Sequence, residues 1–419
     1  MIRRRPVRLS AVAAIAVVIA SLTACGSTPH TAVASTSPDA ASSTTVAPAT
    51  APPPTSTSTT RPKPTTTKPA TTTTTTVPPG PQNITLAFAG DLLPHGPINA
   101  RAAQYGRATG KPYDYAPMLA PMAPIITKAD VAICHMEVPV APPGQPITTY
   151  PSFGSPPQLV DGAKSAGYDG CSNASNHSLD RGRAGIQATL DRFDQDGMHH
   201  AGTARTALEA ITITKYQVKG LTVAHLSYAY DFNGYRLPAD APWAANKIDP
   251  KRIRADAARA RREGADLVVV SLHWGTEYDS NPSRYQRDVA SQILTSKDIS
   301  LVIGCHAHVV QPIGKVNGTY VVWGMGNQLA NQRQVPKSDG ITVVATAHRS
   351  PNGKWGIAGI EAVPTWIEAG SFRVLPVVAT LRNPATPAGL RSELAASYDR
   401  TVNVLRRQPT RGVTVAARP

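Results

Sequence analysis

Six side chains suited to binding divalent metal ions follow short apolar runs in this 419-residue sequence. They are Asp91, Glu137, Asn176, His273, His306 and His308. A dinuclear metal centre needs a carboxylate that can bridge two cations, and neutral imidazoles with an amide oxygen to complete each ligand shell. Any one of these residues alone more often forms a turn or a structural hydrogen bond. Because the set is complete, we predict a divalent metal site, with local strand packing as the alternative.

The spacing of three histidines in these motifs bears on chemistry. His177 directly follows Asn176, so it should lie at the edge of the metal site, where its imidazole can protonate a leaving group. Asp180 could orient that imidazole, or it could cap the helix that follows. His306 and His308 are two residues apart, and on an extended loop their side chains would point the same way, toward neighbouring ligand positions.

The elements that position these residues alternate between strands and helices. Short apolar runs predict buried strands at Ile84 to Gly90, Val131 to His135, Tyr168 to Cys171, Leu267 to Leu272, Leu301 to Gly304 and Tyr320 to Trp323. Helical patterns that end before a glycine cover Pro157 to Ala166, Ala184 to Gln195 and Pro250 to Glu263. This alternation predicts an α/β domain with a largely parallel sheet and outer helices. The metal-binding motifs follow strand ends, where functional groups gather in such sheets.

The pattern changes after Gly340. Three further runs, at Ile341 to Ala347, Trp355 to Thr365 and Phe372 to Val378, predict consecutive antiparallel strands. A closing helix is expected near Pro387 to Arg406. The basic stretch that includes Arg400, Arg406, Arg407, Arg411 and Arg418 could contact wall polymers or lipid headgroups, although a frayed solvated tail is the expectation we favour.

Several motifs resemble, in their order and spacing, those of the CapA family of poly-γ-glutamate capsule biosynthesis proteins, in the metallophosphatase-like (calcineurin-like) superfamily. The matching blocks are Gly90-Asp91, the Glu137 segment, Ser175-Asn176-His177, the Ser227 to Gly234 loop, His273-Trp274-Gly275-Thr276-Glu277, Gly304 to Pro312 and Gly324-Met325-Gly326-Asn327. The resemblance covers about residues 85 to 380. We therefore place a CapA-like domain at 83–382, followed by a C-terminal helix and basic tail at 383–419.

The resemblance implies a four-layer α-β-β-α sandwich of the metallo-dependent phosphatase type. It also implies a site for one or two divalent ions (Mn, Fe or Zn), and a role in making, exporting or trimming poly-γ-glutamate or a related anionic polymer. In a metal-dependent hydrolase, His177 would be the general acid, and Glu277 and Asn327 would position the substrate. The cleaved bond could be a phosphoester or a γ-glutamyl amide, because a Lewis-acidic cation polarises either. The alternative is a non-catalytic accessory that binds the polyanion for a polymer synthesis or export complex.

This chain departs from the family pattern at four places. His135 stands where the family commonly has Asn, Ser175 where it often has a first Asn, and Gln328 where a Phe usually follows the Gly-Asn pair. Phosphatases of the wider fold have Asp-x-His at the first block, whereas this chain has Leu93 two residues after Asp91. One ligand is therefore missing unless His95 loops back, which favours a mononuclear or weakly dinuclear site.

The chain begins with features of an exported lipoprotein. Four arginines and an apolar run from Ala11 to Leu22 precede Leu22-Thr23-Ala24-Cys25, which is a secretory signal closed by a lipobox. The run of roughly 12 residues is too short for the ~20 that a bilayer-spanning helix needs. We predict a signal peptide at 1–24, lipidation of Cys25, and a location on the outer face of the cell membrane, in a Gram-positive or actinobacterial envelope.

A linker rich in Ser, Thr, Pro and Ala occupies residues 25–82. With almost no large apolar side chain, it should stay disordered. At ~3.1 Å per residue it could reach on the order of 170 Å, so we interpret it as a stalk. The alternative is a disordered tail with no reach requirement. Threonines of the linker are also open to glycosylation.

Charge and cysteine content narrow the partners. The formal charge is +15, and removing four signal arginines and two net linker charges leaves about +9 for the domain. An anionic polymer suits such a domain, and nucleic acid is not expected outside the cell. Cys134, Cys171 and Cys305 remain after lipidation of Cys25. The first two end neighbouring predicted strands and could form a disulfide; otherwise they are small buried core residues.

Overall fold

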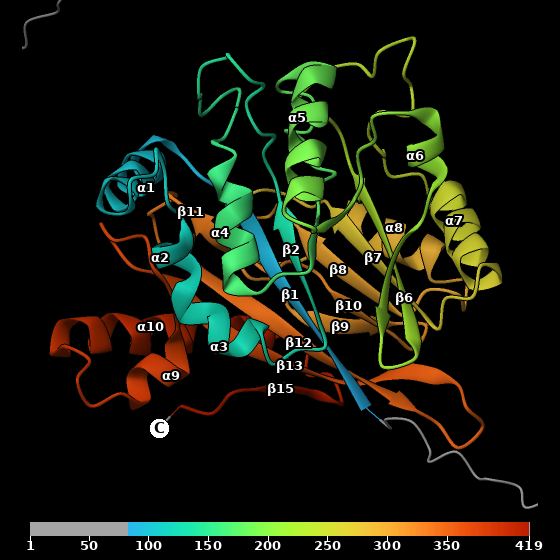
Figure 1. Cartoon of the computed structure of the whole chain (residues 1–419). Helices are drawn as coiled ribbons and strands as arrows, with labels where there is room; N and C mark the ends of the chain where they lie inside the picture. Colours follow the sequence, from blue (N-terminus) through green and yellow to red (C-terminus); the bar gives the residue numbers. More distant parts are fainter. Residues whose placement is uncertain (1–82, 419) are drawn as a thin grey trace, which may run out of the picture. The chain divides into compact units, whose positions relative to one another are not determined.

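Two β-sheets form the centre of the computed structural model, which describes residues 83–418 (Figure 1). The predictions for the signal peptide, Cys25 and the linker lie outside these residues. The first sheet has the order β14-β13-β12-β1-β2-β3-β4, with β11 paired to β1 and β15 paired to β13. The second sheet has the order β5-β6-β7-β8-β10-β9.

The strands have the following bounds. The first sheet contains β1 (Asn83–Leu93), β2 (Val131–Met136), β3 (Gly170–Ser172), β4 (His199–Ala201), β11 (Asn327–Ala330), β12 (Asp339–Arg349), β13 (Trp355–Ile367), β14 (Val374–Pro376) and β15 (Val413–Val415). The second contains β5 (Thr214–Val218), β6 (Leu221–Ala229), β7 (Leu267–His273), β8 (Leu301–Cys305), β9 (Ile313–Val316) and β10 (Thr319–Val322). The pairs β1–β2, β2–β3, β3–β4, β6–β7 and β7–β8 are parallel, as expected for strands joined through helices. The β8–β10 pair is also parallel, although the chain between these strands forms β9 and no helix.

Helices cover the outer face of each sheet. They are α1 (Gly96–Thr109), α2 (Ala116–Leu119), η1 (Ala120–Met122), α3 (Ala123–Ile126), α4 (Gln158–Ala166), α5 (Gly182–Gln195), α6 (Ala207–Ile211), α7 (Pro250–Arg262), α8 (Arg284–Ile293), α9 (Val377–Arg382) and α10 (Ala388–Leu405). Within residues 83–418, no helix has the length and apolar character needed to cross a bilayer.

Three apolar clusters separate these elements into four layers. Side chains alternate between the faces of a strand, so Phe88 of β1 and Val269 of β7 meet in the core between the two sheets. Ala87 of β1 instead faces the outer side, in a cluster shared with α1, α4 and α5. Val268 of β7 faces α7 and α8 on the other outer side. The order helix, sheet, sheet, helix confirms the four-layer α-β-β-α sandwich.

The C-terminal region differs from the sequence-based expectation in two respects. The run Phe372 to Val378 forms only the short strand β14 before α9 begins at Val377, so its last residues are helical. The basic tail is not frayed, because β15 pairs in parallel with β13 and Arg400 forms two hydrogen bonds of 2.7 and 2.8 Å with the buried Asp339. Residues 383–418 therefore pack on the same sheet as the preceding strands.

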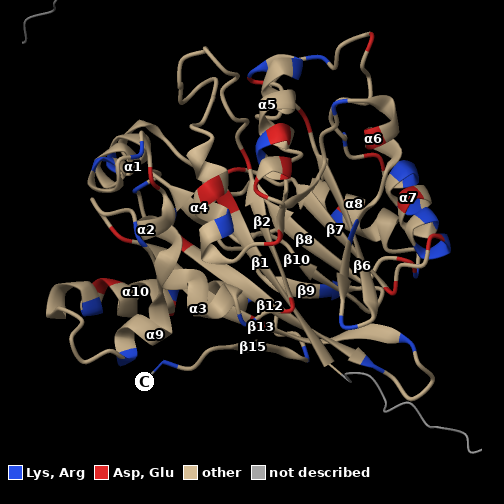
Figure 2. Ribbon diagram, viewed as in Figure 1, with Lys and Arg blue, Asp and Glu red and all other residues tan. Residues whose placement is uncertain are grey.

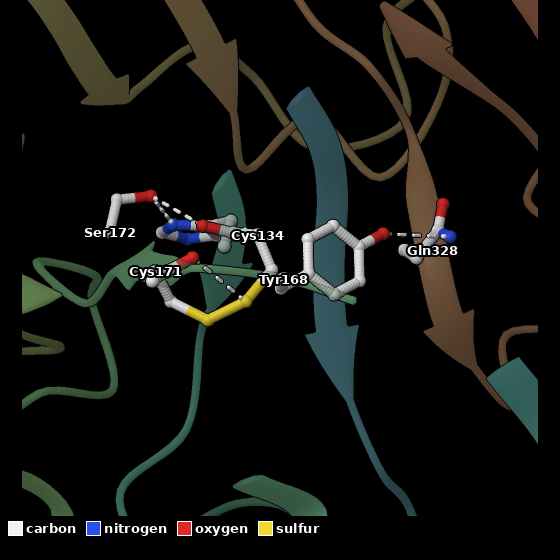
Figure 3. Close-up of a disulfide and its surroundings, with 7 residues drawn as sticks. Cys134, Tyr168, Cys171, Ser172 and Gln328 are labelled. Atoms are coloured by element: carbon white, nitrogen blue, oxygen red, sulfur yellow. Dashed lines mark hydrogen bonds between the residues drawn. A yellow bond between two sulfur atoms is a disulfide. The ribbon is translucent and has the colours of Figure 1, made fainter. Parts of the chain in front are cut away.

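The cysteines of β2 and β3 are bonded to each other (Figure 3). Cys134 and Cys171 are partners in the parallel register of these strands, with Cα atoms 4.4 Å apart, and form a disulfide. Cys305 is a buried free thiol at the end of β8. Figure 3 also shows the buried Gln328, where the family usually has Phe, donating a hydrogen bond to the Tyr168 hydroxyl.

Candidate metal centre

Four parallel strands deliver the candidate ligands to one end of the space between the sheets. Asp91 lies near the end of β1, where the pairing with β2 and with β11 shifts register. Glu137 directly follows β2, His273 ends β7, and His306 directly follows β8. All four residues are at most 2% exposed. The apolar core between the sheets therefore ends in a buried layer of carboxylates and imidazoles.

The backbone at His306 and His308 differs from the extended loop that we expected. His306 has a φ of 92° and His308 a φ of 55°, backbone values that residues other than glycine rarely adopt. The two rings nevertheless lie near each other, with centroids 5.9 Å apart. The expected proximity is present, but it arises from a bent backbone rather than from side-chain alternation. Such conformations persist only where the surrounding structure enforces them.

Glu137 is shared between two groups of metal-binding atoms. Glu137 with His273 and His306 forms one group, and Glu137 with Asp91 and His308 forms the other; within each group the ligand atoms lie within 4.8 Å of one another. Both Glu137 carboxylate oxygens are buried without a hydrogen-bond partner, as is Nδ1 of His306. An unpaired buried carboxylate is costly unless a cation compensates it. The residues therefore fit one or two divalent ions.

The pKa shifts without metal follow from burial and mutual charge. Burial raises the pKa of Glu137 well above its usual range. Burial alone would also raise the pKa of Asp91, but the hydrogen bond and charge of His308 outweigh it and lower that pKa. Burial lowers the pKa of His306 to about 3 and that of His273 well below its usual range, so both imidazoles are neutral and able to bind metal.

His308 behaves differently from the other two imidazoles. Burial lowers its pKa, but the negative charges of Glu137 and Asp91 outweigh this effect and raise the pKa to about 9. The protonated ring is thus the cation that balances the carboxylates in the metal-free site. A bound metal ion would take over that balance and displace the proton.

A series of polar contacts holds the imidazole ring of His273 in place. Its Nε2 lies 2.7 Å from Oδ1 of Asn176, and its Nδ1 lies 2.9 Å from Nε2 of His135. His135 in turn lies 2.8 Å from the Ser172 hydroxyl through its Nδ1. When Nε2 of His273 binds a metal, its Nδ1–H can donate to His135, which orients the ring. Sequence reasoning noted His135 only as a departure from the family pattern and missed this role, because its partner is 138 residues away.

His177 lies beside this centre and is held by two neighbours. Its Nδ1 is 2.7 Å from Asp180 Oδ2 and 3.3 Å from Nδ2 of Asn233. Asp180 Oδ2 also accepts a hydrogen bond from the backbone N–H of Phe153, so the carboxylate is fixed. Arg181 is the N-cap of α5, so Asp180 orients His177 and does not cap that helix. His177 is only 7% exposed, deeper than the edge position expected for it.

The two residues predicted to position substrate occupy different places. Glu277 is exposed, and its carboxylate forms a third candidate metal-binding group with His306 and His308. Asn327 is buried, with Oδ1 3.0 Å from His308 Nδ1. Sequence reasoning also missed two tyrosines that lie beside the imidazoles. The Tyr230 ring centroid is 4.6 Å from that of His306, and the Tyr278 centroid is 6.0 Å from that of His308.

His95 does not supply the missing ligand. Its Nδ1 lies 3.0 Å from the Leu93 carbonyl oxygen and 3.3 Å from the backbone nitrogen of Asn331. The ring packs edge-on against Phe153, and His95 is absent from the candidate metal-binding groups found in residues 83–418. An ion bound beside Asp91 would therefore need a fourth ligand other than His95.

The four-layer sandwich, with candidate carboxylate, amide and imidazole ligands at the strand ends, is the arrangement that the metallophosphatase-like resemblance predicts. The sequence of the chain gives the narrower assignment. The chain belongs to the family described as "Bacterial capsule synthesis protein PGA_cap", whose profile matches residues 85–332.

Similar curated proteins include the PGA biosynthesis protein CapA of Bacillus subtilis (strain 168), 28% identical over 50% of this chain and 56% of that protein. The capsule biosynthesis protein CapA of Bacillus anthracis is 26% identical over 54% of this chain and 53% of that protein. A probable polyglutamine synthesis accessory protein of Mycobacterium tuberculosis is 24% identical over 48% of this chain and 56% of that protein. The chain thus spans about half the length of the curated relatives it matches.

Solved structures with some similarity include the calcineurin-like phosphoesterase YfkN from Bacillus subtilis. It has 12% identity and a TM-score of 0.44, and the match covers 77% of this chain and 99% of that chain. A putative 5'-nucleotidase from Staphylococcus aureus has 15% identity and a TM-score of 0.44, and the match covers 75% of this chain and 58% of that chain.

Proposed function

We propose that this protein is a metal-dependent hydrolase that acts on poly-γ-glutamate or a related anionic capsule or wall polymer during its synthesis, export or trimming. One observation carries the proposal: the Glu137 carboxylate is buried between two groups of ligands, and neither of its oxygens has a hydrogen-bond partner. A carboxylate in this position has a stabilising role only when cations are bound. Family membership supports a role in capsule polymer synthesis.

The residues divide into ligands and a proton donor. Asp91, Glu137, Asn176, His273, His306 and His308 would hold one or two Mn, Fe or Zn ions. When bound, such ions polarise a phosphoryl or carbonyl oxygen as Lewis acids. Asp180 accepts the Nδ1–H of His177 and thereby directs the other nitrogen, Nε2, to deliver a proton to the leaving group. The exposed Glu277 and Tyr278 lie beside His308 and would contact the polymer chain.

The proposed substrate is anionic, and the charge of the chain supports this choice. Basic residues are concentrated on α7 (Figure 2), whose Lys251, Arg254 and Arg262 form no salt bridge among the described residues. Unpaired surface cations attract polyanions over several ångströms. We also propose that Cys25 is lipidated and anchors the protein on the outer face of the membrane of a Gram-positive or actinobacterial cell, near a polymer synthesis or export complex.

A second candidate function is a non-catalytic accessory that binds the polymer through the same cleft. Two observations favour it. Leu93 replaces the histidine of the Asp-x-His motif, and the Mycobacterium tuberculosis relative is named an accessory protein. In this case the polymer would bind at this site without being cleaved, whether or not metal is bound.

The test combines metal analysis with turnover. Purified protein would be analysed for Mn, Fe and Zn beside a His273→Ala, His306→Ala double variant, with the exposed His348→Ala as control. Each protein would then be incubated with poly-γ-glutamate and with a generic phosphodiester. We expect metal and turnover in the wild type and the control, and neither in the double variant. Metal-free wild-type protein that still binds the polymer would refute the hydrolase and support the accessory function.

A further inference from the structure

The two ion positions of the proposed centre are not equally well supplied with ligands. The position built from Glu137, His273 and His306 has Asn176 Oδ1 beside it as a fourth donor. The position built from Asp91, Glu137 and His308 has only three. Leu93 is a buried apolar residue, and His95 is held elsewhere. A fourth protein donor near Asp91 would decide whether this position binds an ion.

The β11 strand brings Asn327 to this place. Asn327 is the register partner of Asp91 in the parallel pairing of β1 and β11, and it is 1% exposed. Its Oδ1 lies 3.0 Å from His308 Nδ1, and Asp91 Oδ2 lies 3.0 Å from the same nitrogen. Donors bound to one ion at about 2.1 Å stand about 3.0 Å apart at neighbouring octahedral positions. Both oxygens therefore lie at a distance from His308 Nδ1 that fits ligands of a common ion.

The amide of Asn327 is fixed in the orientation that this role requires. Its Nδ2 faces three acceptors: the His308 carbonyl at 3.3 Å, Gln332 Oε1 at 3.1 Å and the Lys337 carbonyl at 2.9 Å. An amide nitrogen donates to such groups, whereas the amide oxygen would be repelled by them. Oδ1 must consequently point toward His308 and Asp91.

A simple hydrogen bond to His308 accounts for only part of this arrangement. Nδ1 of His308 carries at most one hydrogen, yet two oxygens lie at the same 3.0 Å distance from it. One N–H cannot form two full hydrogen bonds. A metal ion bound to Nδ1, by contrast, attracts both oxygens at once.

We propose that Asn327 Oδ1 is the fourth protein ligand of the ion held by Asp91, Glu137 and His308, and takes the place of the histidine missing at Leu93. The inference rests on the proposed metal centre. Three oxygens and one imidazole form a harder donor set than the two imidazoles of the other position. Oxygen-rich sites suit Mn²⁺, whereas imidazoles suit Zn²⁺ or Fe. The Asp91 position is thus the one selective for Mn²⁺.

The alternative fourth ligand for the ion beside Asp91 is the sulfur of Cys305. Cys305, Asp91 and His135 also form a candidate group. However, His135 Nε2 is 3.9 Å from Asp91 Oδ1 but 2.9 Å from His273 Nδ1, so that nitrogen is already engaged. A thiolate ligand would moreover favour Zn²⁺ over Mn²⁺. Experiment can distinguish Asn327 from Cys305 as the fourth ligand, because only Cys305 would form a metal–sulfur bond.

The direct experiment is a crystal structure of the full-length protein, purified in detergent and soaked in MnCl₂, with anomalous scattering measured at the manganese edge. We expect an anomalous peak within about 2.4 Å of Asn327 Oδ1, beside Asp91 and His308. A peak at the Asp91 position bonded to Cys305, or one that leaves Asn327 Oδ1 unbound, would overturn the inference. In parallel, the Co²⁺-loaded protein should lack a thiolate charge-transfer band, and a band abolished by Cys305→Ser would equally refute it.

Ion counting provides a second readout that does not depend on turnover. Wild-type protein should bind two Mn²⁺ ions and Asn327→Ala one, while Gln332→Ala, which leaves two acceptors around Nδ2, should still bind two. One ion in the wild type at the Glu137, His273 and His306 position would refute this inference and leave the proposed function standing. Two ions in both the wild type and Asn327→Ala would also refute it. Two correctly placed ions without hydrolysis of any polymer would support the inference and refute the hydrolase.

Discussion

Two histidine-containing polar regions lie among the described residues, and they handle their charges in opposite ways. The metal centre, defined by Asp91, Glu137, Asn176, His273, His306 and His308, contains buried carboxylate oxygens without partners. The second region, the Arg205 cavity, has a volume of about 460 Å³ and lies among β4, α6, β5, β6 and α7. There, Arg205 forms salt bridges to Asp191, Asp194 and Glu209.

The difference shows how an ion site can be told from a structural charge cluster. The Arg205 cavity is larger than any opening at the metal centre among the described pockets, and it is lined by His199, His200 and His225. Its acids are nevertheless neutralised by arginines, since Asp256 also pairs with Arg259. At the metal centre, both oxygens of Glu137 lack a hydrogen-bond partner, and among the described residues no arginine or lysine pairs with Glu137 or Asp91. The need for an external cation therefore marks the functional site better than the number of histidines or the size of the cavity.

The largest effect is expected for Glu137→Gln, which removes the carboxylate shared by both ion positions. Wild-type protein should gain about 2.7 kcal/mol of stability at a metal concentration of 100 times Kd, and the variant should gain none. Without metal, the variant should differ little in stability from the wild type, because an amide replaces a carboxyl group that has no hydrogen-bond partner. Chemical denaturation with Mn²⁺ or EDTA measures both, with the exposed Glu361→Gln as control. Equal stabilisation of wild type and Glu137→Gln by metal would remove the contrast between the two regions.

The next effect concerns pH. In the metal-free protein, the pKa of His308 is raised to about 9, so its stabilising charge is fully present below about 6.5 and is lost as the pH rises through 9. The raised pKa of Glu137 acts in the same direction. Metal must displace these protons, so its affinity should increase about tenfold per pH unit for each proton released. Calorimetric titration between about pH 6.5 and 8.5, in buffers of different ionisation enthalpy, counts the protons. An affinity independent of pH would contradict the assignment of His308 as a ligand.

The features of the metal centre that depend on local sequence pattern could be predicted from the sequence. Apolar runs located the β1, β2, β7 and β8 strands, and the ligands at their ends followed from the convergence of parallel strand ends. The pairing of Asn327 with Asp91 depends on the placement of β11 beside β1, far away in the chain. The same limit applies to the contact of His135 with His273 and to β15. Positive φ at His306 could not be foreseen, since nothing in the type of residue requires it.

A smaller effect is expected for His135→Asn, which restores the residue common in the family. The shorter asparagine side chain would not reach His273 Nδ1 as the imidazole does at 2.9 Å, so His273 would be less well oriented. Loss of such a supporting partner typically lowers metal affinity by about tenfold or more. His199→Asn, in the exposed part of the Arg205 cavity, is the matched control and should leave affinity unchanged. Metal titration followed by fluorescence distinguishes the two. Unchanged affinity in His135→Asn would mean that His273 is positioned by Asn176 alone.

The smallest effect on metal is expected for Arg205→Ala, although this variant removes a more extensive ion-pair network than any variant above. Asp191, Asp194 and Glu209 would lose their common partner, at a cost of about 1–2 kcal/mol in the free energy of unfolding, because these acids are partly exposed and water solvates them in part. Metal content should equal that of the wild type, and Arg205→Lys should recover part of the stability. Denaturant unfolding and elemental analysis on the same samples provide both values. If Arg205→Ala lost its metal, the cavity and the metal centre would be one coupled site, and the arginine would have to be regarded as part of the function.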